Sequence, residues 1–87
     1  MHNPAEERAK AQSMRKSGWW QDQIQNGVCY YCDASVDKSS ATMDHVVPIS
    51  QGGKSTKGNI VVCCKSCNTE KKSMTAVEWL LAKSSLH

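Results

Sequence analysis

The chain has 87 residues, no phenylalanine, five cysteines and a formal net charge of +3 at pH 7. This length allows one small domain, which often needs a metal or disulfide to supplement a limited hydrophobic core. The longest apolar run, Ile60 to Cys64, is far shorter than a membrane span, and the polar amino end does not resemble a signal peptide. We therefore expect a cytoplasmic protein without a membrane partner, whose cysteines stay reduced and serve metals or catalysis.

A helix is predicted at the amino end. The stretch Asn3-Pro4-Ala5-Glu6 combines an N-cap residue, a proline at the first helical position and a glutamate three residues after the cap. Gly18 is expected to break or bend this helix. Trp20 and Ile24 lie at helical spacing, and we interpret them as core residues rather than ligand contacts. Asn26-Gly27 is a plausible helix end, because glycine tolerates the left-handed C-cap conformation.

Two short strands are predicted in the middle of the chain. The first covers Thr42 to Val47 and ends at Pro48, which lacks the N–H needed for strand pairing. The second covers the β-branched residues Ile60 to Val62. Of the remaining segments, 28–32 is predicted as a turn or strand fragment, and 33–41 and 50–59 as loops.

Two further helices are predicted near the carboxyl end. Residues 65–72 have a composition that allows a helix, and residues 75–78, Thr-Ala-Val-Glu, fit a capping box. The expected order is helix, strand, loop, strand, helix, helix. We divide this single α+β domain into an amino-terminal helical extension (1–27), a central core (28–72) and a carboxyl-terminal helix (73–87).

Four of the cysteines form two C-x-x-C pairs. Cys29 and Cys32 are separated from Cys64 and Cys67 by 31 residues. Two such pairs can supply four thiolates to a tetrahedral Zn²⁺, and structural zinc is favoured over disulfides or free thiols. We interpret the remaining Cys63 as a buried apolar residue that continues the second strand.

A second group of polar residues surrounds His45. Asp44 precedes it, Asn59 opens the second strand and Asn68 lies in the predicted helix. A hairpin folded onto that helix could bring all four toward one cleft. Carboxylate and amide oxygens are hard ligands suited to Mg²⁺ or Mn²⁺, and a neutral imidazole can accept a proton from water.

These motifs together resemble the HNH endonuclease family. The resemblance rests on C-Y-Y-C, D-H-V-V-P, G-G, N-I-V-V-C-C-K-S-C-N and a following lysine, and extends from Cys29 to Lys72. It implies a small ββα-metal core with a structural zinc ion, flanked here by amino- and carboxyl-terminal helices. It also implies a metal-dependent enzyme that hydrolyses phosphodiester bonds in double-stranded DNA.

The resemblance also implies roles for individual residues. His45 would be the general base, and Asn59 would hold the loop and orient the histidine. Asp44 and Asn68 would hold the catalytic metal, while the four paired cysteines would hold zinc. Asparagine at position 68 departs from the common histidine, which shifts the expected catalytic metal toward Mg²⁺ or Mn²⁺.

Lysines near the second C-x-x-C pair are the predicted DNA contacts. Lys65, Lys71 and Lys72 would bind backbone phosphates, which confers affinity without sequence choice. One active site cuts one strand, so we expect a monomer to nick DNA. The alternative is a non-catalytic zinc-binding module that recognises nucleic acid or protein. A thiol redox protein using Cys29 and Cys32 explains less, because Cys64 and Cys67 would then have no purpose.

Overall fold

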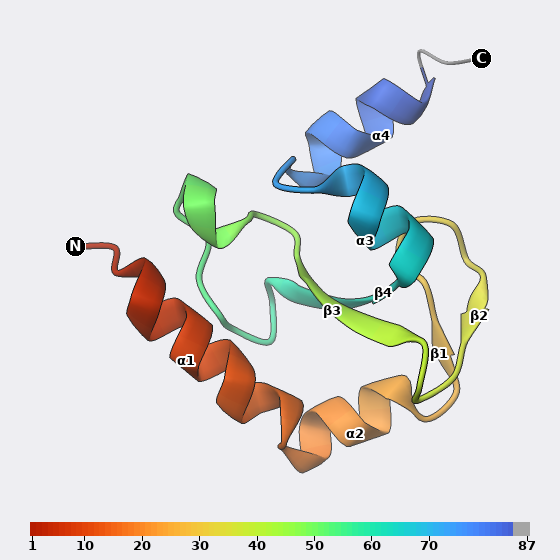
Figure 1. Ribbon diagram of the computed structural model, residues 1–87, viewed down its shortest axis with the longest axis horizontal. Coiled ribbons are helices and arrows are strands. Elements are labelled where there is room, and N and C mark those ends of the chain that lie inside the picture. Colours follow the sequence, from red (N-terminus) through yellow and green to blue (C-terminus); the bar gives the residue numbers. More distant parts are fainter. Residues whose placement is uncertain (85–87) are drawn as a thin grey trace.

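An antiparallel hairpin forms the centre of the structure, a computed structural model in which residues 1–84 are described. Its strands are β3 (Ala41–His45) and β4 (Ile60–Cys64), with Ala41 opposite Cys64 and His45 opposite Ile60. The helix α3 (Lys65–Lys71) follows β4 directly and packs against both strands (Figure 1). This ββα unit, with helices before and after it, confirms the predicted fold class.

The hairpin separates two layers of side chains, because successive residues of a strand point to opposite faces. One face packs against α1 (Pro4–Arg15) and α2 (Gly18–Ile24). The core on that face consists of Ala11, Trp20, Ile24, Val36, Met43, Ile60 and Val62. The opposite face carries Thr42 and Asp44, which contact α3. The neighbours Asp44 and His45 therefore lie on different faces of β3.

The amino-terminal helix is interrupted, as predicted. Asn3 caps α1 by accepting a hydrogen bond from the backbone N–H of Glu6. The break occurs at Ser17, whose hydroxyl donates to the carbonyl of Met14 and accepts from the N–H of Trp20. One serine thus closes α1 and caps α2, and this turn directs Trp20 into the core as expected.

Two of the predictions for the middle of the chain were wrong. The segment 33–41, predicted as loop, contains β2 (Ser35–Val36), which pairs with β1 (Gly27–Val28) in a second small sheet. Each of these strands has only two residues, too few to show an alternating pattern. In addition, β3 ends at His45 rather than Val47, because the side chain of Asn59 takes the N–H of Val47.

The last helix, α4 (Ala76–Ser84), begins with the predicted capping box. Thr75 Oγ1 accepts from the N–H of Glu78 at 3.1 Å, and the Glu78 carboxylate accepts from the N–H of Thr75 at 2.8 Å. Trp79 on this helix is buried, with 6% of its surface exposed. Among residues 1–84, no helix is long and apolar enough to cross a membrane.

Candidate functional site

The two C-x-x-C pairs converge on one point. Cys29 and Cys32 lie in the turn after β1, Cys64 ends β4 and Cys67 lies on α3, and their four sulfur atoms are within 4.8 Å of one another. The Sγ atoms of Cys32 and Cys64 are 3.8 Å apart. A tetrahedral zinc ion with Zn–S bonds of about 2.3 Å holds its sulfurs about 3.8 Å apart. The cluster is therefore a candidate zinc site, as predicted.

Cys29 and Cys63 are both fully buried but differ in acidity. Burial raises the pKa of Cys29, but backbone hydrogen bonds, first from Cys64, outweigh it and lower the pKa to about 6. Burial raises the pKa of Cys63 to about 12. Burial also raises the pKa of Cys67, so position in the cluster, and not acidity, separates the four candidate zinc ligands from the buried core residue Cys63.

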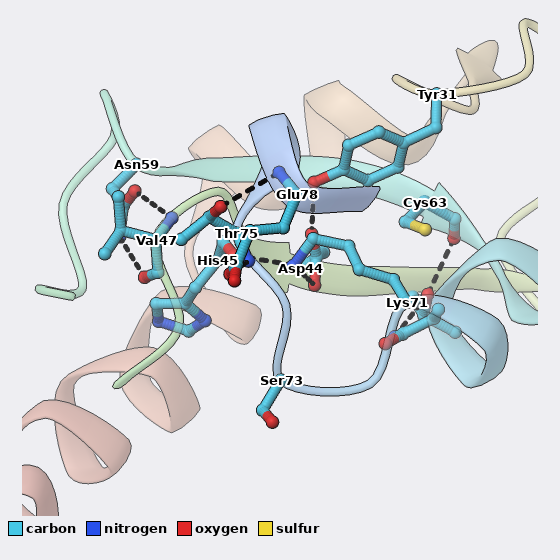
Figure 2. Close-up of polar contacts among 12 residues, drawn as sticks. Tyr31, Asp44, His45, Val47, Asn59, Cys63, Lys71, Ser73, Thr75 and Glu78 are labelled. Carbon is cyan, nitrogen blue, oxygen red and sulfur yellow. Dashed lines mark hydrogen bonds and ion pairs between the residues drawn. The ribbon is translucent and has the colours of Figure 1, made fainter. Parts of the chain in front are cut away.

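The carboxylate of Asp44 is buried at the centre of a polar cluster (Figure 2). Lys71 Nζ lies 3.2 Å from its Oδ2, and the Tyr31 hydroxyl donates to the same oxygen at 2.5 Å. Burial and this hydrogen bond raise the pKa of Tyr31 above its ordinary range, which keeps the phenol protonated as a donor. A cation and a phenol thus neutralise and fix the one carboxylate on this face of β3.

Lys71 occupies a different environment from the one predicted. Its side chain is fully buried, and its ammonium contacts both Asp44 and, at 3.3 Å, the carbonyl oxygen of His45. The expectation that Lys71 contacts a DNA phosphate is therefore corrected: in this structure the ammonium is not accessible to one. Lys65 and Lys72 are exposed and remain available.

Asn68 lies on the same side of the hairpin as Asp44. Its Nδ2 donates to Thr42 Oγ1 at 2.9 Å, and Thr42 in turn donates to the carbonyl of Cys63. Thr42 and Asp44 are two residues apart on β3 and share a face. Among residues 1–84 no hydrogen bond joins Asn68 to Asp44, and the side-chain oxygen of Asn68, Oδ1, accepts none.

His45 points to the other face and is held there by Ser55. The ring Nε2 is 2.9 Å from Ser55 Oγ, and that hydroxyl donates to the Glu7 carbonyl at 2.5 Å. Because a serine hydroxyl has one proton, Ser55 must accept from Nε2–H, so the lone pair of the neutral ring lies on Nδ1. Burial lowers the pKa of His45, which favours this neutral form.

Asn59 closes the loop that carries Ser55. Its Oδ1 accepts from the N–H of Val47, and its Nδ2 donates to the carbonyls of Val47 and Lys54 at 3.0 and 2.9 Å. The side chain thus ties together both ends of the turn next to Ser55. The four polar residues singled out in the sequence are placed by separate hydrogen bonds, and His45 faces away from Asp44.

Three residues of the site were not identified from the sequence. Tyr31 lies within a C-x-x-C pair and looks like part of the zinc turn. Ser55 sits in a glycine-rich loop, and Glu7 lies 48 residues away from it on α1. No local pattern connects these positions, so only the folded chain brings them to Asp44 and His45.

Comparisons with known proteins agree with this geometry. A family model described as HNH endonuclease matches residues 29–79, more than half of the chain. Over 58 residues, or 66% of the chain, it is 38% identical to the CRISPR-associated endonuclease Cas9 of Corynebacterium diphtheriae and 29% identical to that of Actinomyces naeslundii. The chain spans about 5% of the length of these two relatives. With the hairpin, the helix and the cysteine cluster all in place, the chain belongs to the HNH endonuclease family.

Proposed function

We propose that this domain hydrolyses phosphodiester bonds in double-stranded DNA, using Mg²⁺ or Mn²⁺ and cutting one strand per active site. The observation that carries the proposal is the state of His45. Its Nε2 is occupied by Ser55, so Nδ1 is the basic nitrogen, and burial lowers the pKa of the ring, which favours the neutral form. A neutral imidazole with one fixed and one basic nitrogen is equipped to accept a proton from an attacking water.

The metal ligands in this proposal are Asp44 and Asn68. A buried carboxylate and an amide oxygen without a hydrogen bond in residues 1–84 are both hard oxygen donors, which suit Mg²⁺ or Mn²⁺. The site also already holds a cation, the Lys71 ammonium. A divalent ion bound there would stabilise negative charge on the phosphate and the leaving oxygen. To admit it, Lys71 and Tyr31 must release at least one carboxylate oxygen. Because Asp44 and His45 lie on opposite faces of β3, the phosphate would have to lie at the end of this strand to reach both.

Positioning and DNA affinity come from other residues. Asn59 holds the loop that carries Ser55, and Ser55 holds His45. Lys65 and Lys72, at the two ends of α3, are exposed and would contact backbone phosphates. The reduced thiols that the zinc site requires suit the cytoplasm, where we place the protein, acting as a monomer.

Plasmid cleavage tests the proposal. Zinc-loaded protein should convert supercoiled plasmid to relaxed circles when Mg²⁺ or Mn²⁺ is added, and should leave it intact without either ion. DNA binding without cleavage across both metals and a wide pH range would instead support the non-catalytic zinc module.

The metal assignment has its own test. Asp44→Asn/Lys71→Met, which removes both buried charges together, and Asn68→Ala should each raise the Mn²⁺ concentration needed for half-maximal cleavage, while the bound zinc measured in the purified protein stays unchanged. Glu70→Gln, an exposed change on the same helix, is the control. If Asn68→Ala lost zinc while retaining its Mn²⁺ dependence, the assignment of Asn68 would be wrong.

A further inference from the structure

A pocket beside His45 is formed largely by the amino-terminal helix. It has a volume of about 340 Å³, at the lower end of the range for ligand pockets. Its lining residues are Arg8, Ala11, Gln12, Arg15, His45 and Ile49. The four from α1 follow the spacing i, i+3, i+4 and i+7, so they form one face of that helix. Ala11 is buried and lets the helix lie close to the hairpin, while Arg8 and Arg15 extend on either side of it.

The pocket is positively charged. Two guanidinium groups line it, and none of its lining residues is acidic. Glu7, the adjacent acid on α1, is directed to Ser55 and Lys10 instead. Within residues 1–84, neither Arg8 nor Arg15 forms an ion pair.

We propose that Arg8 and Arg15 bind a phosphodiester of the DNA strand that is cut at His45. A guanidinium offers a planar pair of donors that matches two phosphate oxygens, and within residues 1–84 neither arginine has an ion pair to break on binding it. The helix α1 would then complete the active site, although it lies outside the residues 29–79 matched by the family model. This inference rests on the proposed nuclease function and adds a substrate-binding element to it.

Charge-removing variants test the assignment. Arg8→Gln/Arg15→Gln should weaken binding to a duplex at least tenfold, measured with His45→Ala protein so that no cleavage occurs. The slope of log affinity against log salt should fall by about one, because the contact with one phosphate is lost. In the His45 background, the same pair of changes should lower kcat/KM for cleavage by at least the same factor. Lys16→Gln, which removes one charge from the end of α1 outside the pocket, is the matched control.

A double substitution by lysine keeps both positive charges but removes the planar guanidinium donors. Arg8→Lys/Arg15→Lys should retain the salt slope but recover only part of the cleavage rate, since an ammonium cannot bind a phosphate with two parallel donors. An unchanged thermal midpoint in all variants, expected for exposed side chains, excludes misfolding.

The outcomes distinguish this inference from the proposed function. If wild-type protein cleaves DNA and the double glutamine variant matches Lys16→Gln in affinity, salt slope and kcat/KM, the arginine site is refuted and the nuclease stands. If wild-type protein never cleaves but the double variant loses DNA affinity, the arginine site stands and the nuclease proposal fails.

Discussion

The buried ion pair between Lys71 and Asp44 makes a strong prediction about stability. Lys71→Met keeps most of the side-chain volume but removes the ammonium. Asp44 is only 6% exposed, and among residues 1–84 the Tyr31 hydroxyl would then be the one side-chain donor left to its carboxylate. A buried carboxylate without a cation has lost its hydration, and no ion pair compensates for that loss of free energy. The unfolded state, in which Asp44 is hydrated, becomes correspondingly more favourable.

The expected cost is large for a domain of this size. Removing one partner of a buried ion pair costs about 3–5 kcal/mol, against a total free energy of unfolding of about 5–15 kcal/mol for a typical protein. Lys71 also donates to the carbonyl of His45, which would lose that hydrogen bond. For a domain of this length the thermal midpoint should fall by roughly 15 °C or more.

Urea unfolding of zinc-loaded protein, followed by tryptophan fluorescence, measures this cost. Lys72→Met, an exposed neighbour, should stay within about 0.5 kcal/mol of wild type. Asp44→Asn/Lys71→Met should recover much of the loss, because it removes both charges and leaves Tyr31 a carbonyl oxygen to donate to. A Lys71→Met protein as stable as the Lys72→Met protein would mean that the ion pair is not buried in solution.

Three other predictions follow from the site. Replacing Cys29 with serine should abolish tight zinc binding and lower the melting temperature, whereas Cys63→Ala should retain zinc, as metal analysis of the purified proteins can check. Ser55→Ala should slow cleavage about tenfold or more by freeing the His45 ring, without changing the zinc content; equal rates would contradict the role of Ser55. The Ser55 N–H lowers the pKa of Glu7 below its ordinary value of 4.5, so this contact stabilises the fold above pH 4.5 and is lost as the pH falls further. Glu7→Gln should therefore flatten the dependence of the urea midpoint on pH below 4.5, and an unchanged dependence would contradict this.

Local features of the chain could be predicted where a single segment determines them. The caps at Asn3 and Thr75 depend only on residues three positions away, and both form as expected. The cysteine pairs were informative because tetrahedral zinc chemistry restricts what two C-x-x-C motifs can do. The two-residue strand β2 was missed because it is too short to carry a period, and the predicted turn or strand fragment 28–32 overlaps β1 only at Val28.

The sequence predicted which polar residues form the site, but not which partners each of them contacts. Asp44 and His45 were recognised together, yet strand alternation in β3 sends them to opposite faces, with separate partners. Lys71 looked like a surface lysine, because its burial depends on a carboxylate 27 residues earlier in the chain. The link from Glu7 through Ser55 to His45 spans α1 and the loop after β3, and no sequence spacing indicates it.

Single-turnover cleavage of an end-labelled duplex at saturating Mn²⁺ measures whether His45 is the base of a metal-dependent nuclease. His45→Ala should lower the rate constant by about 10²–10⁴-fold, the usual contribution of a general base. His2→Ala, which removes another partly buried histidine, should leave the rate nearly unchanged. A His45→Ala protein with intact zinc that cleaves as fast as wild type would contradict the account.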